Sequence, residues 1–269
     1  MENLLTLARD CLAAIEPTDK VARTQRAAAL CMQGGCALPT DADPPSQLDP
    51  GRPRRPLLVH HTRLAARKLG APSGRAAFLH ALAHIEFNAI NLAWDAVCRF
   101  RGLPAEFYRD WTQVAGEEAL HFELLRGRLR ALGHDYGDFP AHDGLWEMAG
   151  KTAHDALVRM ALVPRVLEAR GLDVTPGMIA RLRQVGDHAS VQVLERILAD
   201  EIGHVAIGTR WYRFLCRQRA LDPLQTFRGL WREYGLGPVR KPLNTAARHA
   251  AGFDAREIEM LDALDGEVA

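Results

Sequence analysis

The 269-residue chain lacks several features that mark specialised classes of protein. Its 34 basic and 33 acidic residues leave a formal net charge of only +1, which excludes a strongly basic nucleic-acid binder on bulk charge. No apolar run approaches 18 residues, so we expect no membrane span and no membrane partner. Sustained alternation of apolar and polar residues is also absent, which argues against a β-sheet protein. The sequence therefore predicts an all-α fold.

Cysteine is scarce as well. The chain has five cysteines, an odd number at irregular spacings, which excludes a disulfide scaffold and a zinc knuckle. We expect all five to be reduced thiols. The first residues, Met-Glu-Asn-Leu-Leu-Thr, lack the basic start and apolar core of a signal peptide. Together these features predict a cytoplasmic protein.

A long central region does show helical periodicity. Between about 74 and 218, apolar residues recur at three- and four-residue spacings, with Gly and Pro between the runs. The pattern predicts four long helices, at about 74–101, 104–132, 145–171 and 187–219. Pro164 should kink the third helix, Gly171 should end it, and Asp187 should cap the fourth. A shorter helical piece is expected at 176–185.

The segments on either side differ from this region. Helical stretches at about 3–15 and 18–32 come first, followed by a segment at 34–56 whose many prolines exclude a regular helix. The C-terminal segment has several Gly and Pro residues before a last helix near 254–264. We therefore predict three parts: N-terminal helices with a Pro-rich arm at 1–73, a helical bundle at 74–218, and an appendage packed on the bundle at 219–269.

Two short motifs carry the chemistry. Residues 117–121 read Glu-Glu-Ala-Leu-His and residues 200–204 read Asp-Glu-Ile-Gly-His, so both follow the pattern acid-Glu-x-x-His. In a helix, a carboxylate and an imidazole three residues apart lie on one face and can reach one metal ion. With 15 Glu and 11 His, chance predicts roughly 0.6 Glu-x-x-His pairs, even without the preceding acid. Two complete motifs therefore indicate a function rather than a coincidence.

Two further glutamates stand at matching distances from these motifs. Glu86, the single Glu of the first long helix, precedes Glu118 by 32 residues. Glu168, near the end of the third helix, precedes Glu201 by 33 residues. In an antiparallel helical hairpin, Glu86 would lie roughly 24 Å and Glu118 roughly 21 Å from the loop, at nearly one height. Glu86 also lies on an apolar stripe, where a carboxylate must be paired, protonated or metal-bound.

This repeated Glu and acid-Glu-x-x-His pattern resembles the ferritin-like di-iron carboxylate superfamily, near its di-iron tRNA hydroxylase branch. The resemblance covers about 74–218 and implies a ferritin-like four-helix bundle. It implies six metal ligands: Glu86, Glu118, His121, Glu168, Glu201 and His204. The alternative for these six is a set of buried ion pairs. Glu117 and Asp200 would accept hydrogen bonds from the ligand histidines, or else lie on a solvated helix face.

The resemblance also implies a cofactor and an activity. Four carboxylates and two imidazoles suit two Fe ions, with Mn as the alternative. The implied protein activates O2 as a hydroxylase-like oxygenase or oxidase, acting on a small molecule or an RNA-borne substrate. Two alternatives stay open: a ferroxidase or iron-handling protein, and a binding module with a structural di-metal site. The arginines at 52–55, with Arg240 and Lys241, would contact phosphate or form a solvated linker, and a homodimer is left open.

Overall fold

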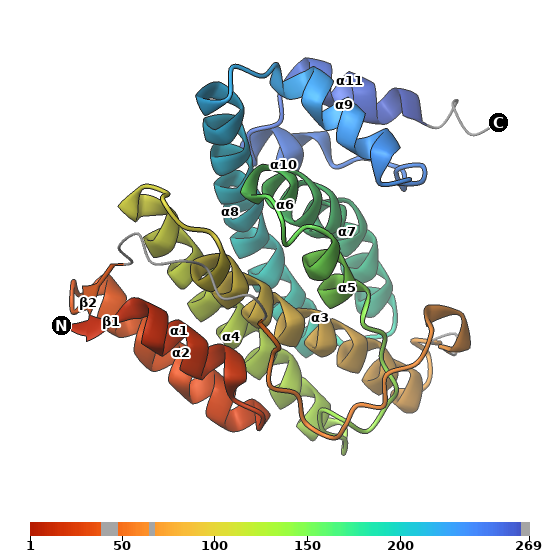
Figure 1. The fold of residues 1–269 in the computed structure, drawn as a ribbon. Coiled ribbons are helices and arrows are strands. Elements are labelled where there is room, and N and C mark those ends of the chain that lie inside the picture. Colours follow the sequence, from red (N-terminus) through yellow and green to blue (C-terminus); the bar gives the residue numbers. More distant parts are fainter. Residues whose placement is uncertain (39–47, 65–67, 265–269) are drawn as a thin grey trace. The chain divides into compact units, whose positions relative to one another are not determined.

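A computed structural model describes residues 1–38, 48–64 and 68–264, and most of them lie in helices (Figure 1). The strand pairing found in these ranges is slight: β1 (Glu2–Asn3) runs parallel to β2 (Cys36–Ala37), and a bridge joins Leu58 to Ala141. The predicted all-α class is thereby confirmed. The middle of the predicted Pro-rich arm, residues 39–47, lies outside the described residues.

The chain divides into two compact units, Met1–Glu147 and Met148–Ala269. The boundary falls within the short helix α5 (Gly144–Lys151). The three-part division predicted from the sequence is a different one and stays a prediction. All five cysteines are free and buried. Across the described ranges, no helix is long and apolar enough to cross a membrane.

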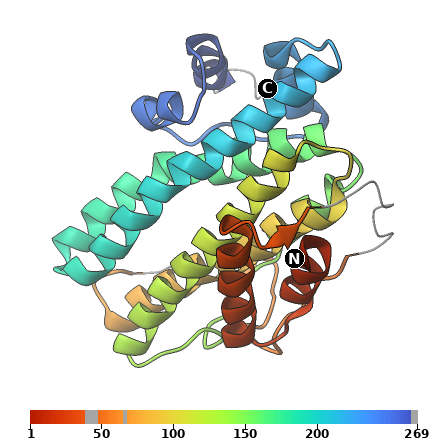
Figure 2. The same cartoon turned by 90° about the vertical axis from the view of Figure 1, so that its left-hand side faces the viewer.

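Unit Met1–Glu147 is organised around one long helical hairpin. Its elements are α1 (Leu4–Ala13), α2 (Pro17–Met32), the 3₁₀ turn η1 (His61–Arg63), α3 (Pro72–Arg99) and α4 (Ala105–Ala131). The connection between α3 and α4 turns at Gly102, whose φ of +67° favours glycine. The two helices therefore pack antiparallel along each other, as Figures 1 and 2 show, with α1 against α3 and α2 against α4. The predicted helices at 74–101 and 104–132 are confirmed within the usual uncertainty of helix ends.

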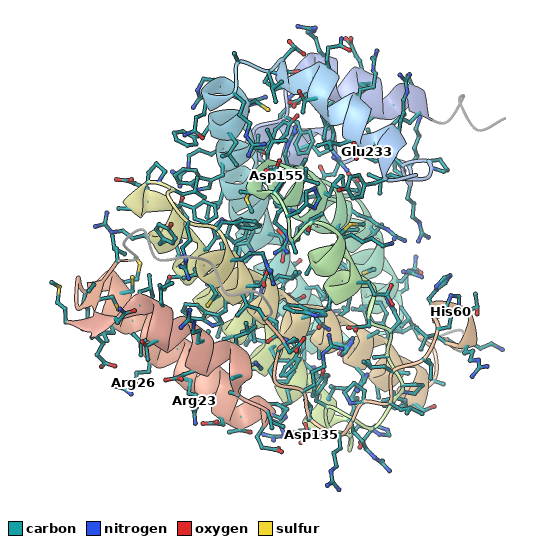
Figure 3. All side chains as sticks on the ribbon, in the orientation of Figure 1. Arg23, Arg26, His60, Asp135, Asp155 and Glu233 are labelled. Carbon is teal, nitrogen blue, oxygen red and sulfur yellow. The ribbon has the colours of Figure 1, made fainter. Side chains whose placement is uncertain are left out.

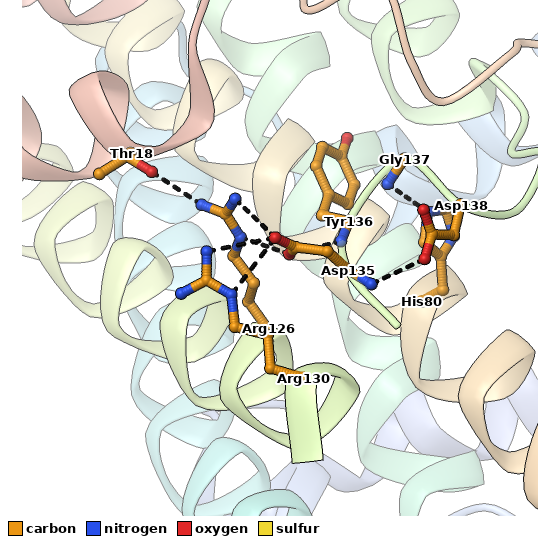
Figure 4. Close-up of polar contacts among 8 residues, drawn as sticks. All are labelled: Thr18, His80, Arg126, Arg130, Asp135, Tyr136, Gly137 and Asp138. Carbon is orange, nitrogen blue, oxygen red and sulfur yellow. Dashed lines mark hydrogen bonds and ion pairs between the residues drawn. The ribbon is translucent and has the colours of Figure 1, made fainter. Parts of the chain in front are cut away.

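The turn-rich connection after α4 is held to the same unit by polar contacts (Figure 4). Asp135 accepts a hydrogen bond from Nε of Arg126 at 2.6 Å, and Arg126 also donates to the hydroxyl of Thr18 on α2 at 2.9 Å. Partial burial would raise the pKa of Asp135, but its hydrogen bonds with Arg126 and the backbone lower it to about 2. The backbone N–H of Gly137 donates to His80 of α3 at 2.9 Å.

Unit Met148–Ala269 contains two long helical runs and three short helices. Its elements are α6 (Ala156–Leu162), the π-helical turn η2 (Val163–Glu168), α7 (Ala169–Gln184), α8 (His188–Gln218), α9 (Pro223–Glu233), α10 (Thr245–Ala250) and α11 (Ala255–Ala263). The predicted cap of α8 is confirmed, because the Asp187 side chain accepts from the Ser190 N–H. Helices α6 and α7 and the turn η2 all pack on α8.

The predicted third helix, 145–171, begins where α5 begins, but it is interrupted after Lys151 and its predicted end is wrong. It starts anew at α6, where Asp155 caps the helix by accepting from the Leu157 N–H at 2.8 Å and pairs with both terminal nitrogens of Arg219 (Asp155 is labelled in Figure 3). It does not stop at Gly171, because α7 runs on to Gln184 and takes in the predicted piece at 176–185. A helical Gly costs only about 1 kcal/mol, which packing on α8 offsets.

The C-terminal segment is more regular than the sequence indicated. The predicted helix near 254–264 is α11, which starts with a reciprocal capping box between Asp254 and Glu257. Helices α9 and α10 were not predicted. The start of α9 carries a signal that the high density of Gly and Pro concealed: Asp222 accepts from the Gln225 N–H, and Pro223 occupies the first helical position.

Candidate metal centre

The first acid-Glu-x-x-His motif lies in the middle of α4, opposite Glu86 of α3. Glu118 and His121 are fully buried, and Glu86 is 5% exposed. Nδ1 of His121 lies 3.4 Å from a carboxylate oxygen of Glu118 and 3.7 Å from one of Glu86. A potential ligand atom of each residue lies within 4.8 Å of those of the other two. Unit Met1–Glu147 thus holds a buried carboxylate–imidazole cluster that could bind a metal ion.

The protonation of this cluster shows why a cation suits it. Burial raises the pKa of Glu86 well above its ordinary value, and the neighbouring Glu118 carboxylate raises it further. Burial by itself would lower the pKa of His121, but Glu118 and Glu86 outweigh it and raise that pKa to about 11. Both shifts mean that, without a metal, Glu86 and His121 retain protons at a higher pH than they would in water. A divalent cation would take the place of those protons, so the donor set fits a metal ion.

The helices present these side chains because the rest of the stripe is apolar. The predicted stripe of α3 is buried throughout: Leu79, Ala83, Ile90, Ala93 and Val97. Phe87 and Phe122, the residues that follow Glu86 and His121, pack against each other with ring centroids 5.5 Å apart. This contact joins the faces of α3 and α4 that carry Glu86 and His121.

The second half of the predicted ligand set lies in unit Met148–Ala269. His204 of α8 is fully buried, and its Nδ1 lies 3.6 Å from a carboxylate oxygen of Glu201, whose side chain is 13% exposed. Glu168 is half-buried and is the last residue of the π-helical turn η2. The predicted kink at Pro164 takes the form of this turn, since proline has no N–H for a regular helical hydrogen bond.

The turn η2 packs closely against α8 where Pro164 meets Gly208. A Cβ atom built on Gly208 would lie only 2.3 Å from the Pro164 ring, so glycine alone fits there. This contact fixes the position of η2 along α8, the helix that also carries Glu201 and His204.

Comparison with known proteins places the chain in a family. A model for a family of proteins of unknown function, DUF455, matches residues 13–259. The chain belongs to the DUF455 family. It is also 49% identical over 216 residues to an uncharacterized protein of Haemophilus influenzae, a match that covers 78% of this chain and 75% of that protein. No solved structure matches. All six predicted ligands lie within the residues that the DUF455 model matches.

In this DUF455 member, predicted ligands approach one another within each of the two units. Glu86, Glu118 and His121 meet in one unit, and Glu201 and His204 meet in the other. The union of these groups, with Glu168, into one set of six stays a prediction.

Glu117 and Asp200, the acids that precede the two motifs, each have a partner one turn earlier on the same helix. Glu117 accepts from Gln113 at 3.0 Å, and Asp200 accepts from Arg196 at 2.6 Å. Neither contact involves a predicted ligand histidine, so the hydrogen bonds from these histidines to Glu117 and Asp200 stay a prediction.

Sequence reasoning missed the buried cations of this DUF455 member. Lys20 of α2 is fully buried and donates to the backbone carbonyls of Cys11 and Leu12 at 2.9 and 2.7 Å. Arg165 and Arg248, in the other unit, are at most 2% exposed. A signal for Arg165 was present, because this charged residue interrupts the apolar run at 160–167. Periodicity alone cannot show whether such a residue is buried.

Proposed function

We propose that this protein holds a di-iron carboxylate centre and uses it to activate O2, as an oxygenase or an oxidase. The observation that carries the proposal is the buried cluster of Glu86, Glu118 and His121, together with a second Glu-x-x-His helix and a further Glu at nearly the same spacing. A structural ion pair needs neither a second carboxylate nor a repeat elsewhere in the chain. In this proposal the two groups supply one centre within a ferritin-like four-helix bundle.

Six residues would hold the ions: Glu86, Glu118, His121, Glu168, Glu201 and His204. The four glutamates would supply carboxylate oxygens to the ions, and His121 and His204 would supply imidazole nitrogens. Four carboxylates would balance the charge of two divalent ions, and Mn is the alternative to Fe. When bound there, two ferrous ions would supply the electrons for the reduction of O2. The buried apolar stripe of α3 keeps water from the Glu86 side of the cluster and so protects the reaction from solvent.

The test is metal loading and O2 uptake of the purified full chain under controlled conditions. After anaerobic loading with Fe(II) and removal of free iron, we expect about two Fe ions per chain and rapid O2 consumption on exposure to air. The double variant Glu118→Ala/Glu201→Ala should lose both. Glu123→Gln is the matched control, because this glutamate lies on the exposed side of α4. Loading that is the same in wild type and double variant would overturn the proposal.

The same experiment separates the alternatives. A ferroxidase or iron store would consume O2 and retain many more than two ferric ions per chain in a large assembly. A structural metal site would raise the melting temperature on loading but leave O2 unconsumed.

A further inference from the structure

A second candidate site lies wholly within unit Met148–Ala269, in a cavity of about 250 Å³. Its walls come from η2 and the start of α7, from α9, from the 236–240 segment, and from α10 and α11. Four of the lining residues are arginines, namely Arg165, Arg170, Arg240 and Arg248, and none of the lining residues is acidic. The cavity is therefore positively charged, and its other walls are largely apolar.

Arg165 forms the buried end of this cavity. Its guanidinium is fully buried and is stacked against the rings of Tyr212, Phe227 and Phe253, with centroids 4.4–4.7 Å away. Only Nη2 has a hydrogen-bond partner, the carboxylate of Glu257, and Nε and Nη1 have none among the described residues. Buried N–H groups without partners cost about 1–3 kcal/mol each, so their retention indicates a ligand that satisfies them.

Arg248 repeats this arrangement at a second position. It is 2% exposed, its Nη2 pairs with Asp173 at 2.6 Å, and its Nη1 has no hydrogen-bond partner in the described structure. Arg170 and Arg240 are exposed and lie at the rim. The four guanidinium groups thus exceed the two carboxylates that pair with them, Glu257 and Asp173.

We propose that this cavity binds a small organic anion, a carboxylate or a phosphate monoester with an apolar body. The N–H donors that Arg165 and Arg248 leave unpaired would form charge-assisted hydrogen bonds with the oxygens of either anion. The apolar body would lie against Leu167, Trp231 and Leu261, which line the same space. Arg165 and Arg248 would donate hydrogen bonds to the charged end, and the rim arginines would attract it. The site is distinct from the proposed metal centre, since none of the six predicted ligands lines it.

Calorimetric titration of the metal-free full chain tests this proposal, with phenyl phosphate and benzoate as the anionic probes. We expect at least one of them to bind and to quench the fluorescence of Trp231, and the tighter of the two identifies the anion class. Benzyl alcohol and inorganic phosphate should bind at least 10-fold more weakly, because each lacks half of the recognised structure. Equal binding of inorganic phosphate would overturn the requirement for an apolar body.

Rim variants make the test independent of folding, because Arg165 substitutions are expected to disturb the core. The double variant Arg170→Gln/Arg240→Gln should bind the anion at least 10-fold more weakly than wild type. The melting temperature of this variant should stay near that of wild type. Arg256→Gln is the matched control: this arginine is exposed on α11 and lies outside the cavity lining. Undetectable binding of both probes, or equal weakening in the control, would overturn the proposal.

Discussion

The two halves of the predicted ligand set share a sequence pattern but differ in the helices that carry them. Glu86 and Glu118 lie near the middle of uninterrupted helices, α3 and α4, and both are buried beside His121. Glu201 and Glu168 are both less buried, and Glu168 ends a π-helical turn that follows from Pro164. The first group is assembled within its own unit. The geometry of the second depends on how η2 packs on α8.

This difference shows that one motif can be supported in two physical ways. In α3 and α4, regular helices and an aromatic contact hold the carboxylates against their repulsion. In the other unit, Glu168 lies at the end of a π-helical turn and is only half-buried. We therefore expect the first group to bind a metal ion more tightly than the second. Four predictions test this comparison, from the largest effect to the smallest.

The largest effect is expected from removing a ligand of the assembled group. Glu118→Gln should weaken Fe(II) binding about 100-fold or more, since it removes a buried charge at the centre of the cluster, beyond the 10–100-fold typical of supporting residues. Glu168→Gln should weaken binding by only about 10-fold. Anaerobic competition against a chromophoric chelator measures both. An equal loss of Fe(II) affinity in the two variants, or a larger loss in Glu168→Gln, would contradict tighter binding by the first group.

The next prediction concerns the seat of η2 on α8. Gly208→Ala places a methyl group 2.3 Å from the Pro164 ring, and overpacking of this kind costs about 1–3 kcal/mol. The melting temperature of the metal-free protein should fall, and Fe(II) affinity should fall with it. Gly203→Ala on the same helix meets nothing within 4 Å and should stabilise the helix by up to about 1 kcal/mol. Equal melting temperatures and Fe(II) affinities of the two variants would contradict a role for the contact between Gly208 and Pro164.

A third prediction compares the buried cations of the two units. Burial lowers the pKa of Lys20 from 10.5 to about 7. Between these two values the unfolded chain binds more protons at this residue than the folded chain, so Lys20 makes the free energy of unfolding rise with pH. Burial also lowers the pKa of Arg165, but a guanidinium keeps its proton throughout this range.

Lys20→Met should therefore remove a stability increase of about 2 kcal/mol between pH 7 and 9. Denaturant unfolding at both pH values measures the change in the free energy of unfolding for wild type and for the variant. Subtracting one change from the other cancels the contributions of other groups. Lys151→Met, at an exposed position, should leave the pH dependence unchanged. If the free energy of unfolding of Lys20→Met rises between pH 7 and 9 as much as that of wild type, the effect belongs to another residue.

The smallest effect is expected at the acids that precede the motifs. If Glu117 and Asp200 orient the ligand histidines, Glu117→Gln and Asp200→Asn should each weaken Fe(II) binding by about 10-fold. The same chelator competition detects this change. Unchanged affinity in both variants would assign these acids to a solvated helix face, where they contact Gln113 and Arg196.

The approach of Glu86 to Glu118 and His121 could be predicted from the sequence because it depends on local periodicity. Glu86 stands on an apolar stripe, and a short loop requires α3 and α4 to be neighbours, so Glu86, Glu118 and His121 had to approach one another. The end assigned to the third helix failed at Gly171, because a single glycine is a weak signal that packing against another helix overrides. The burial of Lys20 and Arg165 could not be predicted, since their partners are backbone carbonyls and aromatic rings supplied by other elements.

The central claim is that the two groups of ligands form one di-iron centre, and Mössbauer spectroscopy with electron paramagnetic resonance tests it most directly. The full chain would be loaded anaerobically with ⁵⁷Fe(II) and then exposed to O2. We predict about two ions per chain that become a magnetically coupled diferric pair without a signal from isolated ferric iron. A single ion per chain, or two ions that give the signal of isolated high-spin ferric iron, would contradict the claim.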